Sequence, residues 1–290
     1  MKKIITSVIA SIALSLAPAA FAAEPADTVT VFMIGDSTMA NKPTDSDKQE
    51  RGWGQLLATH LQGPVKVDNH ARNGQSSLSF INEGKWDAVV EKIRPGDFVI
   101  IQFGHNDEKL NKPSRGTTPG GTFDANLRRF VEETRAKGGR PILMNAIVRR
   151  NFPLSVEPGK EAGPAGPEKK ASAMDSIQEG DILVDTHGLW RDAPRNVAQL
   201  MRVPFVDMNT VTHKYIQELG PIESRKIYMW IPAGKFEFCP DGKIDNTHLN
   251  IYGATVISRL AADAIAAEVP DFAQYVRPCC KEGGKGGCCK

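Results

Sequence analysis

Continuous apolar runs that end at glycine or polar residues, and that alternate with helical segments, most constrain what this chain can fold into. Val29–Ile34 is such a run and ends in Gly35-Asp36-Ser37, and Asp97–Phe103 is the clearest of them. Strands buried on both faces of a parallel sheet have this pattern. The sequence therefore predicts a single three-layer α/β domain with a mostly parallel central sheet and helices on both faces.

The alternation continues along the chain. Further strands are predicted at 65–68, 141–147 and 204–206, and helices at 80–93, 123–136, 189–201 and 250–267. Residues 153–167 are rich in proline and glycine and indicate a loop, because the alternation resumes after them. We expect one folded domain at 23–272, a leader at 1–22 and a tail at 273–290.

The leader has the features of a secretory signal peptide. Lys2 and Lys3 precede an apolar run from Ile4 to Leu16, and Ala20-Phe21-Ala22 supplies a small-x-small cleavage site. A transmembrane anchor is the alternative, but the run is shorter than the roughly 20 residues that span a bilayer. We expect cleavage before Ala23, and a mature protein that is secreted or periplasmic with no membrane attachment.

The composition excludes two classes of protein. With 41% hydrophobic and 24% charged residues, the chain is too apolar to be disordered. Its formal charge is +2, and loss of Lys2 and Lys3 with the leader makes it neutral. A nucleic-acid-binding domain would carry a clear excess of basic residues, so we expect no nucleic acid partner.

Ser37 is the first candidate for catalysis. It follows a predicted buried strand, so its hydroxyl can project from a tight turn while its own N–H faces a developing oxyanion. A helix N-cap is the more common role for a serine in this position.

Asp245 and His248, ahead of the last predicted helix, are the second candidate group. Serine needs a base within hydrogen-bond reach, and a carboxylate three residues upstream on the same loop can fix the tautomer of that base. A solvated histidine beside a capping aspartate is the alternative. His187, in Asp185-Thr-His-Gly188, is a rival base with its own nearby carboxylate.

Gly74 and Asn106 are candidates for binding an oxyanion. Each follows a predicted strand, and a glycine N–H and an asparagine amide are donors of the kind that form oxyanion holes. A turn and a loop cap are the corresponding structural roles. Asp36 is interpreted as bonding the turn at Ser37, and His105 as supporting its loop.

These motifs, in this order, resemble the four blocks of the SGNH/GDSL hydrolase superfamily. Further stretches look like its rhamnogalacturonan acetylesterase branch: Gly52-Trp53-Gly54-Gln55, Phe103 to Glu108, Arg149-Arg150, Asp185-Thr-His-Gly188 and Asp245-Asn-Thr-His-Leu-Asn250. The resemblance covers residues 29–267. It implies a flavodoxin-like fold, Ser37 as nucleophile, His248 as base, Asp245 as its orienting carboxylate, and an oxyanion hole from Ser37, Gly74 and Asn106.

The resemblance also implies removal of acetyl groups from plant cell-wall polysaccharide through an acetyl-enzyme, with rhamnogalacturonan or pectin as the expected substrate. Gln75 departs from the branch, which commonly has arginine there, and an uncharged side chain weakens the grip on a galacturonate carboxylate. Trp53, Gln75, Arg149 and His187 are the tentative substrate contacts. Core packing for Trp53 and a solvated surface for Arg149 and Arg150 are the alternatives.

This chemistry needs no cofactor, and we expect no metal. The expected partner is an acetylated polysaccharide or oligosaccharide, and the sequence does not indicate an oligomeric state. A lipase-like or thioesterase-like hydrolase of other acyl esters is the second hypothesis. A non-catalytic carbohydrate-binding relative is the third, and the intact Ser37, His248 and Asp245 argue against it.

Four of the five cysteines lie in the tail, at Cys279-Cys280 and Cys288-Cys289. Disulfides in an oxidising compartment, thiolate metal binding and an appended tag are the alternatives. Cys239 is either buried and free or paired with the tail.

Overall fold

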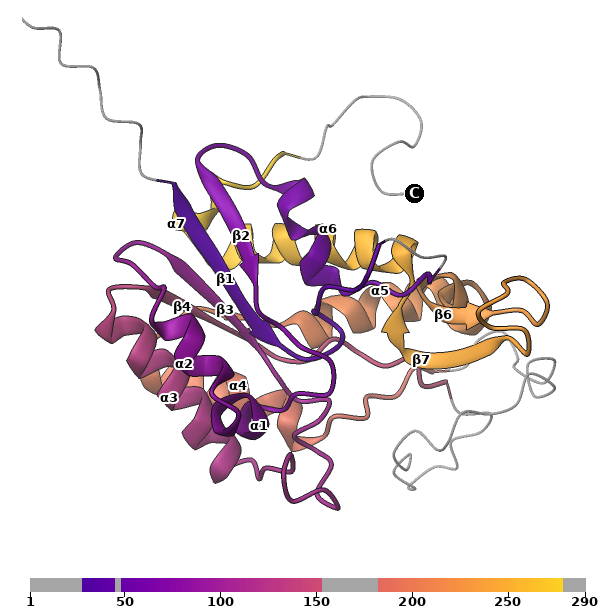
Figure 1. Ribbon diagram of the computed structural model, residues 1–290, viewed down its shortest axis with the longest axis horizontal. Helices are drawn as coiled ribbons and strands as arrows, with labels where there is room; N and C mark the ends of the chain where they lie inside the picture. The colour runs from indigo at the N-terminus through magenta and orange to yellow at the C-terminus, as the bar shows by residue number, and fades with distance from the viewer. Residues whose placement is uncertain (1–27, 45–47, 153–181, 279–290) are drawn as a thin grey trace, which may run out of the picture.

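The computed structural model describes residues 28–44, 48–152 and 182–278. Five strands form the central sheet in the order β2-β1-β3-β4-β5 (Figure 1). All neighbouring strands are parallel, which confirms the predicted sheet. Gly35 pairs with Gln102, so the carboxyl ends of the two central strands lie side by side. The strands are β1 (Val29–Gly35), β2 (Val65–Asn69), β3 (Phe98–Gln102), β4 (Arg140–Met144) and β5 (Phe205–Val206).

Helices cover both faces of this sheet (Figure 1). One face carries α1 (Ser77–Asn82), α2 (Lys85–Val90), α3 (Thr122–Ala136) and α4 (Leu189–Met201). The other carries the 3₁₀ helices η1 (Trp53–His60) and η3 (Ser224–Ile227), with α5 (Met208–Glu223), α6 (Ile251–Glu268) and α7 (Pro270–Ala273). Because side chains alternate along a strand, β1 sends Phe32 to the first layer and Met33 to the second.

The start of α6 is held tightly, and this fixes the segment before it. Asn250 caps the helix by accepting a hydrogen bond from the N–H of Gly253 at 2.8 Å. A Cβ on Gly253 would lie 1.9 Å from the carbonyl oxygen of Ile227, so only glycine permits this close contact with η3. The strand that ends at Leu249 is therefore anchored directly beside the helix cap.

A two-stranded antiparallel hairpin was not predicted. It consists of β6 (Tyr228–Ile231) and β7 (Lys243–Leu249) and lies apart from the central sheet (Figure 1). Asp245 and His248, expected on a loop, lie on β7. The prediction was wrong because β7 is mostly polar and lacks the apolar pattern of a strand.

One predicted helix needs correction, and one helix was not predicted. The single helix expected at 80–93 is two short helices, α1 and α2, because Gly84 adopts a left-handed conformation with φ of 68° between them. Helix α5 was missed, and its polar sequence and internal Gly220-Pro221 kink explain why. In the described part of the chain, no helix is long and apolar enough to cross a membrane. The leader, the 153–167 loop and the tail cysteines lie outside the described residues.

Candidate active site

The turn after β1 presents Ser37. A Cβ on Gly35 would lie 2.6 Å from the carbonyl oxygen of Gln102, so the last residue of the strand must be glycine. Asp36 is fully buried, and its Oδ1 accepts hydrogen bonds from the N–H of Thr38 at 2.9 Å and from its hydroxyl at 2.8 Å. These bonds confirm that Asp36 shapes the turn, and none of its hydrogen bonds within the described residues goes to the histidine.

The hairpin brings a histidine to this serine across 211 residues of sequence. His248 Nε2 lies 2.9 Å from Ser37 Oγ, and His248 Nδ1 lies 2.8 Å from Asp245 Oδ2. The other carboxylate oxygen of Asp245 accepts the backbone N–H groups of Thr247 and His248, both at 2.9 Å. Hydroxyl, imidazole and carboxylate therefore form one continuous line of hydrogen bonds.

The pKa values of the two carboxyl groups near Ser37, those of Asp245 and Asp36, are shifted in opposite directions. Burial raises the pKa of Asp245, but the hydrogen bonds and charge of His248 outweigh it and hold that pKa well below its usual range. Burial raises the pKa of Asp36, and its bonds to Thr38 only partly offset this. Asp245 is thus the carboxylate that stays ionised next to the imidazole.

Asn106 lies at the same end of the sheet, after β3. Its Nδ2 donates to the carbonyl oxygen of Gln75 at 2.9 Å, and its Oδ1 accepts from Lys109 Nζ at 2.7 Å. The amide has a second N–H, so one donor remains for a ligand. Gly74 has φ of 75°, a conformation that favours glycine, and neither its N–H nor that of Ser37 is bonded to a described residue.

Most of the predicted site residues line one pocket of about 690 Å³. Its lining includes Ser37, Asn106, Arg149, His187, Asp245 and His248, and also residues that the sequence did not single out as contacts: Glu108, Lys109, Asn111, Thr186, Trp190, Asn246 and Thr247. Gly74, Gln75 and Trp53 do not line it.

Glu108 was missed, and it organises one wall of this pocket. It forms an ion pair with Arg149, and its Oε2 lies 3.1 Å from His187 Nδ1. His187 Nε2 lies 3.0 Å from the carbonyl oxygen of Ile147, so both ring nitrogens are engaged and His187 does not contact Ser37. The nearby Asp185 instead binds the backbone N–H groups of His187 and Gly188. The sequence spacing therefore pointed to the wrong carboxylate for this ring.

His105 packs against this wall as loop support. Its ring is buried and meets the ring of His187 edge-on, with centroids 4.7 Å apart. No described residue bonds to either nitrogen of the His105 ring, and burial holds its pKa well below the usual range. His105 is therefore a neutral packing group beside the site.

Of the tentative substrate contacts, Trp53 and Gln75 lie away from the pocket, whereas Arg149 lines it. Trp53 is fully buried in the core and donates from Nε1 to Gln102 Oε1 at 2.9 Å, so it is not a substrate contact. The side chain of Gln75 bonds to Ser79 and Glu83, away from the pocket lining. Arg149 lines the pocket, whereas Arg150 is buried against Trp230 and does not.

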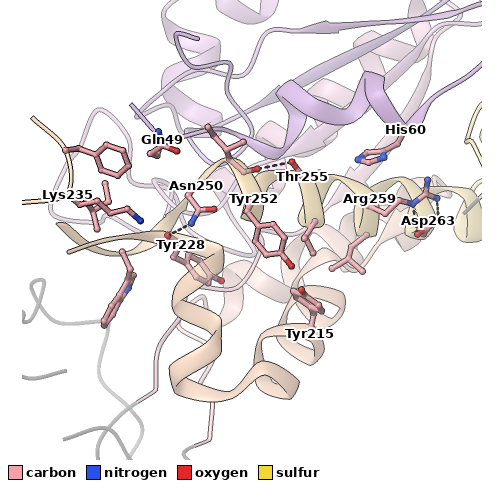
Figure 2. Close-up of a pocket in the computed structure, with 16 residues that line it drawn as sticks. Gln49, His60, Tyr215, Tyr228, Lys235, Asn250, Tyr252, Thr255, Arg259 and Asp263 are labelled. Carbon is pink, nitrogen blue, oxygen red and sulfur yellow. Dashed lines mark hydrogen bonds and ion pairs between the residues drawn. The ribbon is translucent and has the colours of Figure 1, made fainter. Parts of the chain in front are cut away.

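A second groove, of about 630 Å³, is lined by residues of α6, β6 and the segment that follows β6 (Figure 2). Tyr252 from α6 and Tyr215 from α5 line its mainly apolar wall, and the Arg259–Asp263 ion pair lies at one end. None of Ser37, Asn106 and His248 lines this groove, so the reactive groups belong to the first pocket alone.

Comparison with known proteins identifies the family of the chain. Residues 33–224 match the model of the GDSL-like Lipase/Acylhydrolase family. The chain is 32% identical over 237 residues to the rhamnogalacturonan acetylesterase RhgT of Bacillus subtilis, and the match covers 82% of this chain and 89% of RhgT. It is 33% identical over 235 residues to the probable rhamnogalacturonan acetylesterase YesY of the same organism, spanning 81% and 91% of the two chains.

Solved structures share the fold. The chain superposes on YxiM of Bacillus subtilis with a TM-score of 0.63 and 22% identity, covering 84% of this chain and 58% of that one. A variant of Axe2, an acetyl-xylooligosaccharide esterase from Geobacillus stearothermophilus, gives a TM-score of 0.52 at 15% identity and covers 83% and 95% of the two chains. The sequence matches establish the family. The chain belongs to the GDSL-like lipase/acylhydrolase family and is a carboxylic ester hydrolase.

Proposed function

We propose that this protein is an exported serine esterase that removes acetyl groups from plant cell-wall polysaccharide, with rhamnogalacturonan or another pectic polymer as substrate. The observation that carries the proposal is the line from Ser37 Oγ through His248 to Asp245, with contacts of 2.9 and 2.8 Å. Two relatives, one named a rhamnogalacturonan acetylesterase and one a probable rhamnogalacturonan acetylesterase, each above 30% identity, support the substrate class.

The reaction is a two-step acyl transfer. His248 takes the proton of the Ser37 hydroxyl as the oxygen attacks the acetyl carbonyl, and the tetrahedral intermediate collapses when His248 returns that proton to the departing sugar oxygen. Water then attacks the acetyl-enzyme with the same base, releasing acetate and restoring Ser37. Asp245 holds the imidazole in the tautomer with hydrogen on Nδ1, which leaves Nε2 free to accept.

The proposed oxyanion hole consists of the N–H groups of Ser37 and Gly74 and the amide of Asn106. Both backbone groups lack a bond to any described residue. The bonds of Asn106 to Gln75 and Lys109 fix its amide plane, so its remaining N–H is oriented before substrate arrives. Such preorganisation is what makes these donors effective in the transition state.

The charged groups of the pocket bear on the choice of substrate. Lys109 and Arg149 line it together with the carboxylates of Glu108 and Asp245, so the lining has no formal excess of either charge. Glu108 forms an ion pair with Arg149, whereas Lys109 Nζ contacts the amide oxygen of Asn106. Lys109 is thus the cation placed to meet the carboxylate of a galacturonate residue. The side chain of Gln75 is turned toward Ser79 and Glu83 and is not part of the lining.

Acetate release from matched polymers tests this function. Acetylated rhamnogalacturonan, acetylated pectin and acetylated xylan would be compared at equal acetyl concentration, with Ser37→Ala as the inactive variant. Ser114→Ala, on the exposed surface, is the matched control. We expect a preference for the galacturonate-containing polymers, loss of nearly all release in Ser37→Ala and full release in the control. Equal rates for wild type and Ser37→Ala would refute the proposal.

A lipase-like or thioesterase-like activity is the second candidate, and the family name includes lipases. Acetyl and octanoyl esters of one alcohol distinguish the two candidates. A polar pocket lined by Glu108, Lys109 and Arg149 predicts the higher kcat/KM for acetyl. A higher value for octanoyl would favour the alternative.

A further inference from the structure

Asp245 has a cationic partner in addition to the histidine. Its Oδ2 lies 2.8 Å from His248 Nδ1 and also 3.0 Å from the ammonium of Lys243, two residues upstream on β7. The side chain of Asp245 is only 9% exposed, so both contacts are made largely out of water. One carboxylate oxygen is therefore shared between the imidazole and a permanent positive charge.

Lys243 is in turn held by Glu50, from the segment that leads into η1. Glu50 Oε2 lies 3.7 Å from Lys243 Nζ, and Glu50 Oε1 lies 2.7 Å from Lys42 Nζ. Lys42 is almost fully buried and also contacts Asn73 Oδ1, next to Gly74. A chain of alternating charges thus connects the loop of the proposed oxyanion hole to the carboxylate of the triad.

We propose that Lys243 is a positioning residue that sets the basicity of His248 through their shared contact with Asp245, and that Glu50 opposes it. The inference rests on the proposed role of His248 as the general base. The ammonium disfavours a second positive charge on the imidazole, whereas the carboxylate of Glu50 favours it. Lys243 keeps His248 neutral, and able to accept a proton, over a wider range of pH than Asp245 alone would allow, and Glu50 limits this effect.

Other charged and titratable groups near His248 come from separate elements. Asp36 follows β1, His105 follows β3, and Glu50 precedes η1; each interacts electrostatically with the imidazole. The charged or titratable residues that line the same pocket are Glu108, Lys109, Arg149 and His187. His105 is buried and neutral, and Asp36 is buried with a raised pKa. Lys243 and Glu50 are therefore the pair whose charge can be changed without disturbing the turn at Ser37 or the buried loop.

The direction of the effect follows from distance and exposure. The two contacts to Asp245 Oδ2 place the ammonium within about 6 Å of the ring, close enough for its charge to act on the imidazole. The side chain of Lys243 is 31% exposed, and Glu50 offsets part of its charge, so solvent and counter-charge reduce the effect without reversing it.

The test is an NMR titration of the His248 ring in Lys243→Met, Glu50→Gln and Lys243→Arg proteins, with the ring signal assigned by its loss in His248→Ala. We expect the ring titration to move to higher pH in Lys243→Met, to lower pH in Glu50→Gln, and to stay with the wild type in Lys243→Arg, which retains the charge. The acid limb of the pH profile of kcat/KM moves in the same directions. Lys243→Gln replaces Lys243→Met if the latter does not fold.

Opposite shifts for the two charge-removing variants are the signature of electrostatic tuning. A structural role alone would lower kcat while leaving the ring titration in place. An unchanged His248 titration in both Lys243→Met and Glu50→Gln overturns the inference. Because the titration needs no substrate, this result would leave the proposed function standing, and a failed acetate assay would leave the titration result standing.

Discussion

Asp245→Asn changes the chemistry of the site with almost no change in shape. Asp245 accepts three hydrogen bonds, from two backbone N–H groups at Oδ1 and from His248 Nδ1 at Oδ2, and its Oδ2 also forms an ion pair with Lys243 Nζ. An asparagine must direct its oxygen to the two backbone donors, so its NH₂ faces the imidazole. The ring then accepts at Nδ1 and carries hydrogen on Nε2, and it can no longer take the proton of Ser37.

The expected loss of activity in Asp245→Asn is large. In other Ser-His-Asp sites, the wrong tautomer lowers kcat by about 10⁴-fold, equivalent to about 5 kcal/mol of transition-state stabilisation. We expect a loss of this size in kcat for acetyl ester hydrolysis, measured as acetate release at saturating substrate. The new NH₂ also meets the ammonium of Lys243, so a modest fall in the melting temperature accompanies it.

Asp185→Asn is the matched control, because Asp185 also precedes a histidine but lies outside the pocket lining. Its carboxylate binds the backbone of His187 and Gly188 and not the ring, so we expect a loss below about tenfold. An Asp245→Asn enzyme within tenfold of wild type, or an Asp185→Asn enzyme as impaired as Asp245→Asn, would refute the assignment of Asp245.

Three further changes test other parts of the structure. Asn106→Ala should lower kcat by about 100- to 1000-fold with little change in KM, if its amide stabilises the oxyanion; an unchanged kcat contradicts that role. Arg150→Met should lower the free energy of unfolding by about 3 kcal/mol, because the buried Arg150 bonds to Ser224, Asn246 and the carbonyl of Pro221. Chemical denaturation measures this free energy, and a change below about 1 kcal/mol would contradict the prediction. Burial raises the pKa of Asp107 to about 7, so the folded state binds a proton more tightly than the unfolded state, and stability falls as pH rises from about 4 to about 7. Asp107→Asn should make the melting temperature fall less over this range of pH. An equal fall in both proteins would contradict this role of Asp107.

The sequence predicted the part of the fold that follows from local apolar pattern. Runs such as Val29–Ile34 and 97–103 became strands of the central sheet, because a strand buried on both faces needs apolar residues at every position. The segment 189–201 became a helix with the predicted bounds. Where the pattern was weak the predictions were wrong: β7 is a polar strand, and one left-handed glycine, Gly84, divides the helix expected at 80–93.

The site was predicted as far as motif order allows. Ser37, Asn106, His248 and Asp245 do meet at one pocket, as their order along the chain and the family resemblance indicated. The partners that tune the site were not predictable, because they pair residues far apart in sequence. Glu50 reaches Lys243 from the other end of the chain, and Glu108 reaches His187 in place of the nearer Asp185. Only the three-dimensional fold brings those charges together.

The central claim is that Ser37 carries the acyl group during turnover. Rapid quenching of the enzyme with an acetyl ester, followed by peptide mass spectrometry, measures this directly, and His248→Ala serves to check that the base is needed. We predict one acetyl group on the peptide containing Ser37 in wild type, and none in Ser37→Ala or His248→Ala. Acetate release at the wild-type rate by Ser37→Ala, or an acetyl group trapped on another residue, would contradict it.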